Sequence, residues 1–173
     1  TEEKLESHYL KTDNFILVDP LDGTKEFINN TGEFTVNIAY IQNGSPTHGI
    51  VYAPAIKRLF STDHNRKAFE TVKSSAKTGQ LINKPLRVSA PNASALTVVA
   101  SKSRINSETN EYIANYSVSN YKNAGSSLKF CLVANGEADF YPRLGRTMEW
   151  DTAAGHAILL GAGGYVTNLL TKT

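Results

Sequence analysis

The first half of the chain carries the pattern of a β-rich domain. Residues 15–18 form a continuous apolar run that stops at Asp19-Pro20, which predicts a buried strand that feeds a turn. Residues 33–42 carry alternating apolar side chains and are followed by Asn43-Gly44, a hairpin signal. Three more strands are expected, at residues 47–52, 58–62 and 68–72, so the first half should form an antiparallel meander.

The second half mixes strand and helix patterns. The pattern predicts a loop over residues 74–85, short strands at residues 86–89, 96–100, 138–141 and 165–170, and helices over residues 107–116, 126–135 and 151–160. Ser107 is expected to cap the first of these helices, and Gly136 to end the second. Because neighbouring strands often follow each other without a helix between them, the predicted fold class is a layered α/β (α+β) sandwich.

Length, charge and cysteine content narrow the class of protein. The 173 residues predict one domain, with a meander part at residues 1–85 that holds the candidate metal site and a smaller α/β part at residues 86–173. The net charge is +2, and the sequence has no run of Lys and Arg of the kind that binds along the phosphate backbone of a nucleic acid. No nucleic-acid polymer is therefore expected as partner. The single cysteine, Cys131, excludes an intrachain disulfide and favours the reducing cytoplasm. Neither a membrane span nor a signal peptide is expected.

The first chemical motif is Val-Asp-Pro-Leu-Asp-Gly-Thr at residues 18–24. Its proline fixes one backbone angle and its glycine permits a sharp turn, so the carboxylates of Asp19 and Asp22 and the carbonyl of Leu21 can converge. Three such oxygens suit Mg²⁺, and the two amides that follow could hold a phosphate. The alternative interpretation is an Asx-turn after a strand, with no metal.

Two similar motifs are excluded by spacing. A calcium-binding EF-hand loop needs oxygen ligands at its first, third and fifth positions and a glycine at its sixth. Counted from Asp19, the third residue is Leu21 and the glycine comes fifth. Phosphatases of the haloacid-dehalogenase type resemble Asp-x-Asp-Gly-Thr, but here two residues separate the aspartates.

The second chemical motif is Glu-Trp-Asp-Thr-Ala-Ala-Gly at residues 149–155. Asp151 stands at the start of an apolar helix, where a simple N-cap is the alternative interpretation. The small residues after it allow this helix to approach another backbone closely. Asp151 can therefore be delivered deep into a site.

Together the two motifs resemble the paired signatures of the inositol monophosphatase superfamily, over nearly the whole chain. The resemblance implies a lithium-sensitive phosphomonoesterase with two or three Mg²⁺ ions and, in the full-length family, an αβαβα sandwich. Three further segments resemble the bacterial 3′(2′),5′-bisphosphate nucleotidases of sulfur assimilation: residues 22–27 (Asp-Gly-Thr-Lys-Glu-Phe), 125–131 and 138–143. The substrate implied is adenosine 3′,5′-bisphosphate, which loses its 3′-phosphate, and a homodimer is compatible with it.

The resemblance also implies roles in a two-metal mechanism. Asp19 would bridge two metals about 3.5–4 Å apart, with the Leu21 carbonyl on the first metal and Asp22 and Asp151 on the second. Thr24 would orient the attacking water. Substrate contacts are implied for Leu21, Asp22, Gly23, Thr24 and Asp151.

The nucleoside end of the substrate is implied to lie near the later segments. Gly125 and Ser126 would lie beside the nucleoside, and Lys129 and Arg143 would hold the 5′-phosphate, since a second phosphate needs a cation. Alternatives are a solvated helix cation for Lys129 and a surface ion pair for Arg143.

Some positions depart from the family pattern. Arg104 stands where a histidine is frequent, and Glu2 and Glu3 do not match the string that supplies a metal-binding glutamate. We therefore expect an N- and C-terminally shortened chain with exposed apolar surface and a weak first metal site. Three functions stay open: bisphosphate nucleotidase, inositol monophosphatase, and a metal- or nucleotide-binding domain without turnover. Peripheral attachment to the inner membrane also stays open.

Overall fold

The computed structural model describes residues 12–74, 79–100 and 105–169. Its largest element is a six-stranded antiparallel sheet in which the strands follow one another in sequence order. These strands are β1 (Asn14–Asp22), β2 (Thr35–Gln42), β3 (Ser45–Ala53), β4 (Arg58–Thr62), β5 (Ala68–Lys73) and β6 (Leu81–Pro85). Asn43 and Gly44, between β2 and β3, both have positive φ, as the favoured two-residue hairpin requires. The predicted meander is confirmed.

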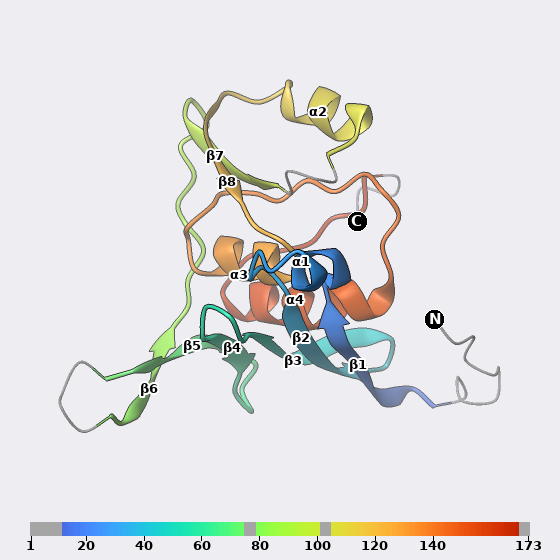
Figure 1. Ribbon diagram of the computed structural model, residues 1–173, viewed down its shortest axis with the longest axis vertical. Helices are drawn as coiled ribbons and strands as arrows, with labels where there is room; N and C mark the ends of the chain where they lie inside the picture. The colour runs from blue at the N-terminus through green and yellow to red at the C-terminus, as the bar shows by residue number, and fades with distance from the viewer. Residues whose placement is uncertain (1–11, 75–78, 101–104, 170–173) are drawn as a thin grey trace.

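The other elements stack above this sheet (Figure 1). Helices α3 (Leu128–Ala134) and α4 (Glu149–Gly161) cover one of its faces, and a parallel pair, β7 (Leu96–Ala100) and β8 (Val118–Asn123), lies beyond them. Helix α2 (Ser107–Ile113) is outermost. The short α1 (Thr24–Ile28) lies next to the segment that precedes α3, since a Cβ on Gly125 would lie 3.1 Å from the Cγ of Glu26. The layered α/β sandwich predicted from the sequence is confirmed.

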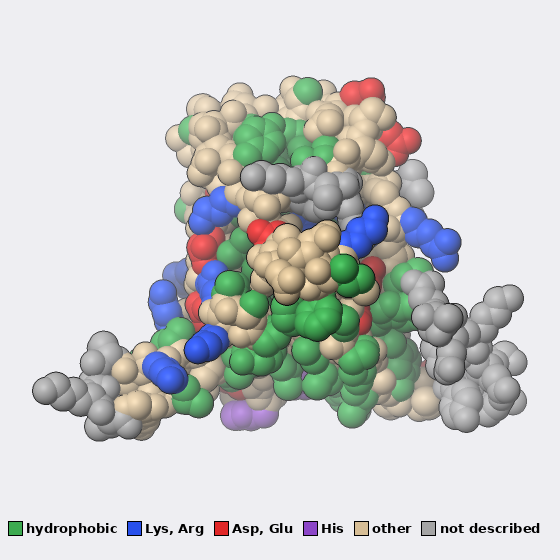
Figure 2. Space-filling model, viewed as in Figure 1, with side chains coloured by type: hydrophobic (Ala, Val, Ile, Leu, Met, Phe, Trp, Pro, Cys, Tyr) green, Lys and Arg blue, Asp and Glu red, His purple; other side chains and the backbone are tan. Residues whose placement is uncertain are grey.

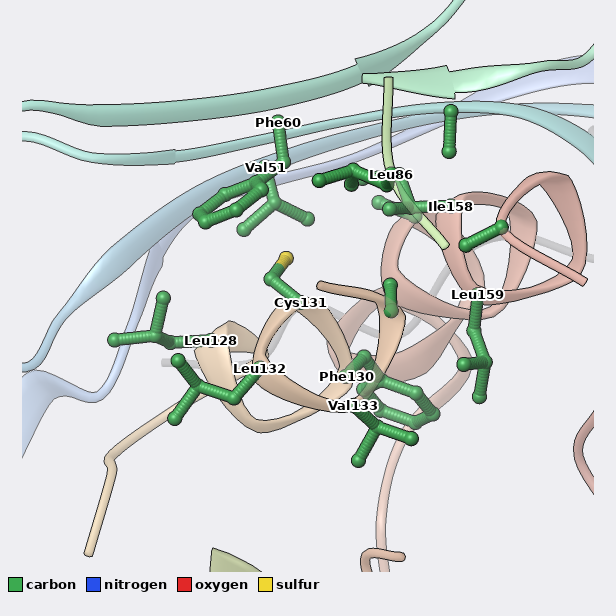
Figure 3. Packing of buried hydrophobic residues seen from close by; sticks show 14 of the residues in the cluster. Val51, Phe60, Leu86, Leu128, Phe130, Cys131, Leu132, Val133, Ile158 and Leu159 are labelled. Carbon is green, nitrogen blue, oxygen red and sulfur yellow. The ribbon is translucent and has the colours of Figure 1, made fainter. Parts of the chain in front are cut away.

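The main core lies between the large sheet and the two middle helices (Figure 3). The sulfur of Cys131 points toward Val51 and Phe60, and all three side chains are fully buried. Helix α4 approaches β3 so closely that a Cβ on Gly49 would lie 2.2 Å from the carbonyl oxygen of Ala154. A glycine is therefore required where α4 crosses the sheet, and this close approach places the start of α4 near β1.

The opposite face of the large sheet is apolar and exposed. Ile16 is 67% and Val18 50% exposed, whereas Phe15 and Leu17 turn inward and pack against the core. Val18, Ile38 and Ile50 form one row across three strands, and green hydrophobic side chains gather over the lower part of the molecule in Figure 2. The prediction of a strand at residues 15–18 is confirmed, but its burial is one-sided because adjacent side chains point to opposite faces.

Several predicted elements were wrong in detail. Residues 81–85 form the edge strand β6, not a loop, and residues 86–89 form no strand. Residues 138–141 contribute only one bridge, between Phe140 and Val98, and residues 165–169 form no strand.

Other corrections concern helices and one strand. Helices α1 and α3 differ from expectation: α1 was not predicted, and α3 begins at Leu128 instead of residue 126. Strand β8 was not predicted either. Asn106, not Ser107, caps α2, because its side chain accepts the amide of Thr109. Glu2, Glu3, Arg104 and residues 170–173 lie outside the described residues.

Candidate active site

Two aspartates of one motif and a third that is distant in sequence meet at one point. One carboxylate oxygen from each of Asp19, Asp22 and Asp151 lies within 4.8 Å of the other two. Strand β1 carries the first two, and the first turn of α4 carries the third. All three are half-buried. The convergence expected from the two sequence motifs is confirmed as geometry.

A bulge in β1 puts Asp19 and Asp22 on one side. Asp19 lies opposite Asn37 and Asp22 lies opposite Thr35, so β1 has one residue more than β2 across this interval. In a regular strand, residues three apart point to opposite faces, and one inserted residue restores a common face. The amide of Leu21 donates to Asp19 Oδ1 at 3.0 Å. The Asx-turn and the convergence of carboxylates therefore coexist.

The start of α4 holds Asp151 in a defined position. Asp151 Oδ2 accepts hydrogen bonds from the amide of Met148 and the hydroxyl of Thr147, both at 3.2 Å. Asp151 is thus the third residue of α4, and its side chain caps the helix by accepting the backbone amide of the N-cap residue. The same side chain reaches the acidic cluster, and the helix dipole favours its negative charge. The N-cap residue is Met148, so the simple N-cap interpretation of Asp151 is wrong.

The electrostatics of the cluster favour a bound cation. Burial, and then the nearby charge of Asp151, raise the pKa of Asp22 to about 6. Burial is also the main cause that raises the pKa of Asp19, and the charge of Asp151 adds to it. Carboxylates forced together in this way are stabilised by a positive charge between them. A set of hard oxygen donors fits Mg²⁺ better than a softer transition metal.

The glycine after Asp22 is required by packing. Gly23 has φ of 88°, and a Cβ there would lie 2.1 Å from Ser126 Oγ. Gly23 precedes α1, in which Thr24 is the first residue and is exposed. The sequence motif thus ends in a turn into a helix, beside the segment that carries Ser126.

A pocket of about 170 Å³ opens beside the aspartates. Its lining includes Asp22, Asp151, Ser126, Lys129 and Arg143. It therefore joins the acidic cluster to two of the predicted substrate cations. Its other lining residues are Gly23, Glu26, Ala100, Ile105, Thr109, Ser127, Phe130, Tyr141, Pro142, Gly145, Arg146, Thr147 and Thr152.

The two predicted cations occupy different environments. Lys129 is only 4% exposed, so its interpretation as a solvated helix cation is wrong. Arg143 is half-buried and donates to the hydroxyl of Tyr141 and the carbonyl of Arg146. Neither of these two hydrogen bonds, within the described part of the chain, is to a carboxylate. They therefore do not support the interpretation of Arg143 as a member of a surface ion pair.

Sequence reasoning missed the residues that hold Asp22. The amide of Ser127 donates to Asp22 Oδ2 at 2.7 Å, and Thr35 and Asn37 of β2 contact the Ser127 hydroxyl. The signal was present in the pair of serines that follow Gly125, but a serine pair alone does not show which distant residue it contacts. Among the described residues, no helix is both long and apolar enough to cross a membrane.

Comparisons with known proteins agree with this geometry. The sequence model of the Inositol monophosphatase family matches residues 1–172. The chain is 45% identical to the 3′(2′),5′-bisphosphate nucleotidase CysQ of Salmonella typhimurium over 157 residues, which cover 91% of this chain and 60% of that protein. It is also 45% identical to the nucleotidase CysQ of Escherichia coli K12, over 87% of this chain and 57% of that protein.

Solved structures give the same result. The crystal structure of CysQ from Bacteroides thetaiotaomicron matches with a TM-score of 0.80 and 39% identity, over 94% of this chain and 64% of that one. The inositol monophosphatase from Anabaena matches with a TM-score of 0.71 and 26% identity, over 91% of this chain and 61% of that one. The chain spans about three-fifths of the length of the curated relatives it matches. With its two motifs brought together in space and the family model matching along its length, this chain belongs to the inositol monophosphatase family.

Proposed function

We propose that this chain belongs to a Mg²⁺-dependent phosphomonoesterase that hydrolyses adenosine 3′,5′-bisphosphate to AMP and phosphate. The observation that carries the proposal is the convergence of Asp19, Asp22 and Asp151, two of which, Asp22 and Asp151, line a pocket that also contains cationic side chains. Relatives 45% identical to the chain are named 3′(2′),5′-bisphosphate nucleotidases, which supports this substrate. The proposal extends to a cytoplasmic enzyme of sulfur assimilation and to a homodimer as its assembly.

The proposed cation ligands are the three carboxylates and one backbone oxygen. Asp19, Asp22 and Asp151 would hold two or three Mg²⁺ ions together with the carbonyl of Leu21. Divalent cations in such a site stabilise the negative charge that develops as a phosphoryl group is transferred to water. Li⁺ is proposed to inhibit by competing at this site.

The remaining residues would bind and orient the reactants. Thr24, exposed at the start of α1, is proposed to orient the attacking water through its hydroxyl. Gly23 leaves room for the close packing of the turn against Ser126, next to the proposed position of the phosphate. Arg143 lines the pocket and offers a guanidinium whose planar geometry suits a second phosphate.

The test is phosphate release by the protein as encoded, with adenosine 3′,5′-bisphosphate and inositol 1-phosphate compared at equal Mg²⁺. We expect faster release from the bisphosphate, and a loss of about 10²-fold or more in the Asp151→Asn variant, because one anionic ligand is removed. An unchanged rate in that variant contradicts the proposal.

A second candidate function is inositol monophosphatase. It is favoured by the structural match to the Anabaena inositol monophosphatase, at 26% identity. Preferential release from inositol 1-phosphate would select it. Binding of Mg²⁺ without release from either compound would select a binding domain without turnover.

A further inference from the structure

Asp22 is held in place by residues 124–129, the segment that follows β8 and includes the first two residues of α3. The amide of Ser127 donates to Asp22 Oδ2 at 2.7 Å. The hydroxyl of Ser126 contacts two carbonyl oxygens, of Asp22 and of Glu33, both at 2.9 Å. One loop, distant in sequence, therefore fixes both the backbone and the carboxylate of Asp22.

A buried chain of polar side chains fixes Ser127 in turn. Its hydroxyl donates to Asn37 Oδ1 at 2.5 Å and lies 2.8 Å from the hydroxyl of Thr35. Because a serine hydroxyl has one proton, Thr35 must donate to Ser127. All three residues are at most 2% exposed. Hydrogen bonds between side chains in such a buried site restrict their arrangement, although the side-chain nitrogen of Asn37 has no hydrogen-bond partner among the described residues. Thr35 lies opposite Asp22 in the pairing of β1 with β2. The hydrogen-bonded side chains therefore connect Ser127 to the residue that pairs with Asp22.

The buried side chain of Lys129 binds the backbone of the same segment. Its Nζ donates to the carbonyl of Ser126 at 2.7 Å and to that of Ala124 at 3.4 Å, and it lies 5.2 Å from the ring centroid of Tyr141. A buried ammonium group is costly unless it is hydrogen-bonded. These carbonyl contacts therefore tie the cation to the backbone that presents Ser126 and Ser127 to Asp22.

We propose that residues 124–129, anchored by Thr35 and closed by Lys129, are a positioning device for Asp22. The proposal rests on the function proposed above, in which Asp22 binds the cation. Residues that orient metal ligands typically change metal affinity or activity by about 10- to 100-fold when they are substituted. Lys129 acts on the site through the backbone of this segment; because it also lines the pocket, its contact with the substrate is tested separately below.

The first experiment removes one hydroxyl without changing charge. Thr35→Val keeps the shape of the side chain but removes its donor, whereas Thr35→Ser keeps the hydroxyl. Free Mn²⁺ is measured by electron paramagnetic resonance with the protein as encoded, and circular dichroism checks the fold. We expect Thr35→Val to weaken Mn²⁺ binding about tenfold and Thr35→Ser to retain it. Equal Mn²⁺ binding by wild type and Thr35→Val overturns the proposal. If Thr35→Val does not fold, Ser127→Ala, which keeps the amide but removes the hydroxyl, takes its place with the same expectation.

The second experiment separates positioning from substrate contact. Lys129→Met is assayed with adenosine 3′,5′-bisphosphate and with adenosine 3′-monophosphate, which lacks the 5′-phosphate. A positioning role lowers kcat/KM by the same factor for both compounds and weakens Mn²⁺ binding. A loss confined to the bisphosphate, with unchanged Mn²⁺ binding, overturns the role of Lys129. If wild type hydrolyses neither compound, the proposed nucleotidase fails, while the Mn²⁺ measurements still decide the positioning role.

Discussion

Without divalent cations, neutralising Asp22 should stabilise the folded chain. Burial and the charge of Asp151 oppose ionisation of Asp22 and raise its pKa from 3.8 to about 6. Asp22→Asn removes the charge but keeps an oxygen that can accept the amide of Ser127, which lies 2.7 Å from Asp22 Oδ2. The variant should therefore lose an unfavourable charge and keep the favourable hydrogen bond.

The magnitude follows from the pKa of Asp22. A pKa difference of one corresponds to about 1.36 kcal/mol, so the rise from 3.8 to about 6 corresponds to roughly 3 kcal/mol at pH 7. For a chain of this size, 1 kcal/mol shifts Tm by about 2–4 °C, which gives an increase of roughly 6–12 °C. Because the folded-state pKa is raised, the stabilising contribution of the protonated carboxyl is complete below pH 4 and is lost as the pH rises through about 6. The advantage of the variant should be small at pH 4 and complete above pH 6.

The assay is thermal unfolding from pH 4 to pH 8, in EDTA and in Mg²⁺. Mg²⁺ should raise the Tm of wild type far more than that of Asp22→Asn, because binding of a ligand to the native state stabilises it. Asp63→Asn is the matched control, since Asp63 accepts the amides of Asn65 and Lys67 in the turn between β4 and β5, outside the acidic cluster. The reasoning is refuted if Asp22→Asn is less stable than wild type in EDTA at pH 7, or if its gain is the same at pH 4.

Three further predictions concern packing and charge. Gly49→Ala should lower the free energy of unfolding by about 1–3 kcal/mol, measured by urea denaturation, because its Cβ would meet the backbone of α4 at 2.2 Å; unchanged stability would contradict the close packing. Arg58→Met should cost about 3 kcal/mol in the same assay, because it leaves the buried Glu70, now 2.6 Å from Arg58 Nε, without its partner; a more stable variant would contradict this. The 173-residue chain should self-associate through its exposed sheet face, and Ile38→Lys with Ile50→Lys should reduce its mass in sedimentation velocity; equal association of both forms would exclude this face.

The sequence predicted those helices and strands whose conformation is determined by their own residues and their immediate neighbours. The hairpin at Asn43-Gly44 follows from two residues that accept positive φ, and β4 and β5 follow from alternation. The convergence of the two aspartate motifs was expected from their joint resemblance to one family, and not from their local patterns, because Asp151 is distant in sequence from Asp19 and Asp22. Local patterns were sufficient wherever adjacent residues determined the conformation.

Elements that depend on distant partners were not predictable in the same way. Strand β6 is polar enough to resemble a loop, and only its pairing with β5 makes it a strand. β8 was missed because the pattern at Val118–Asn123 is mainly polar and its strand conformation depends on the parallel partner β7. The buried contacts of Lys129 could not be inferred either, because a lysine in a helix is usually solvated. These outcomes depend on what packs against a residue, which a single sequence does not show.

The central claim is that Asp19 and Asp22 of the first motif bind one set of divalent cations together with Asp151, which most of the chain separates from them. Anomalous diffraction from crystals of the protein soaked in Mn²⁺ tests it most directly. The account predicts a peak within about 2.0–2.6 Å of carboxylate oxygens from each of Asp19, Asp22 and Asp151. A peak bound by other side chains, or no peak at these three aspartates at saturating Mn²⁺, would contradict it.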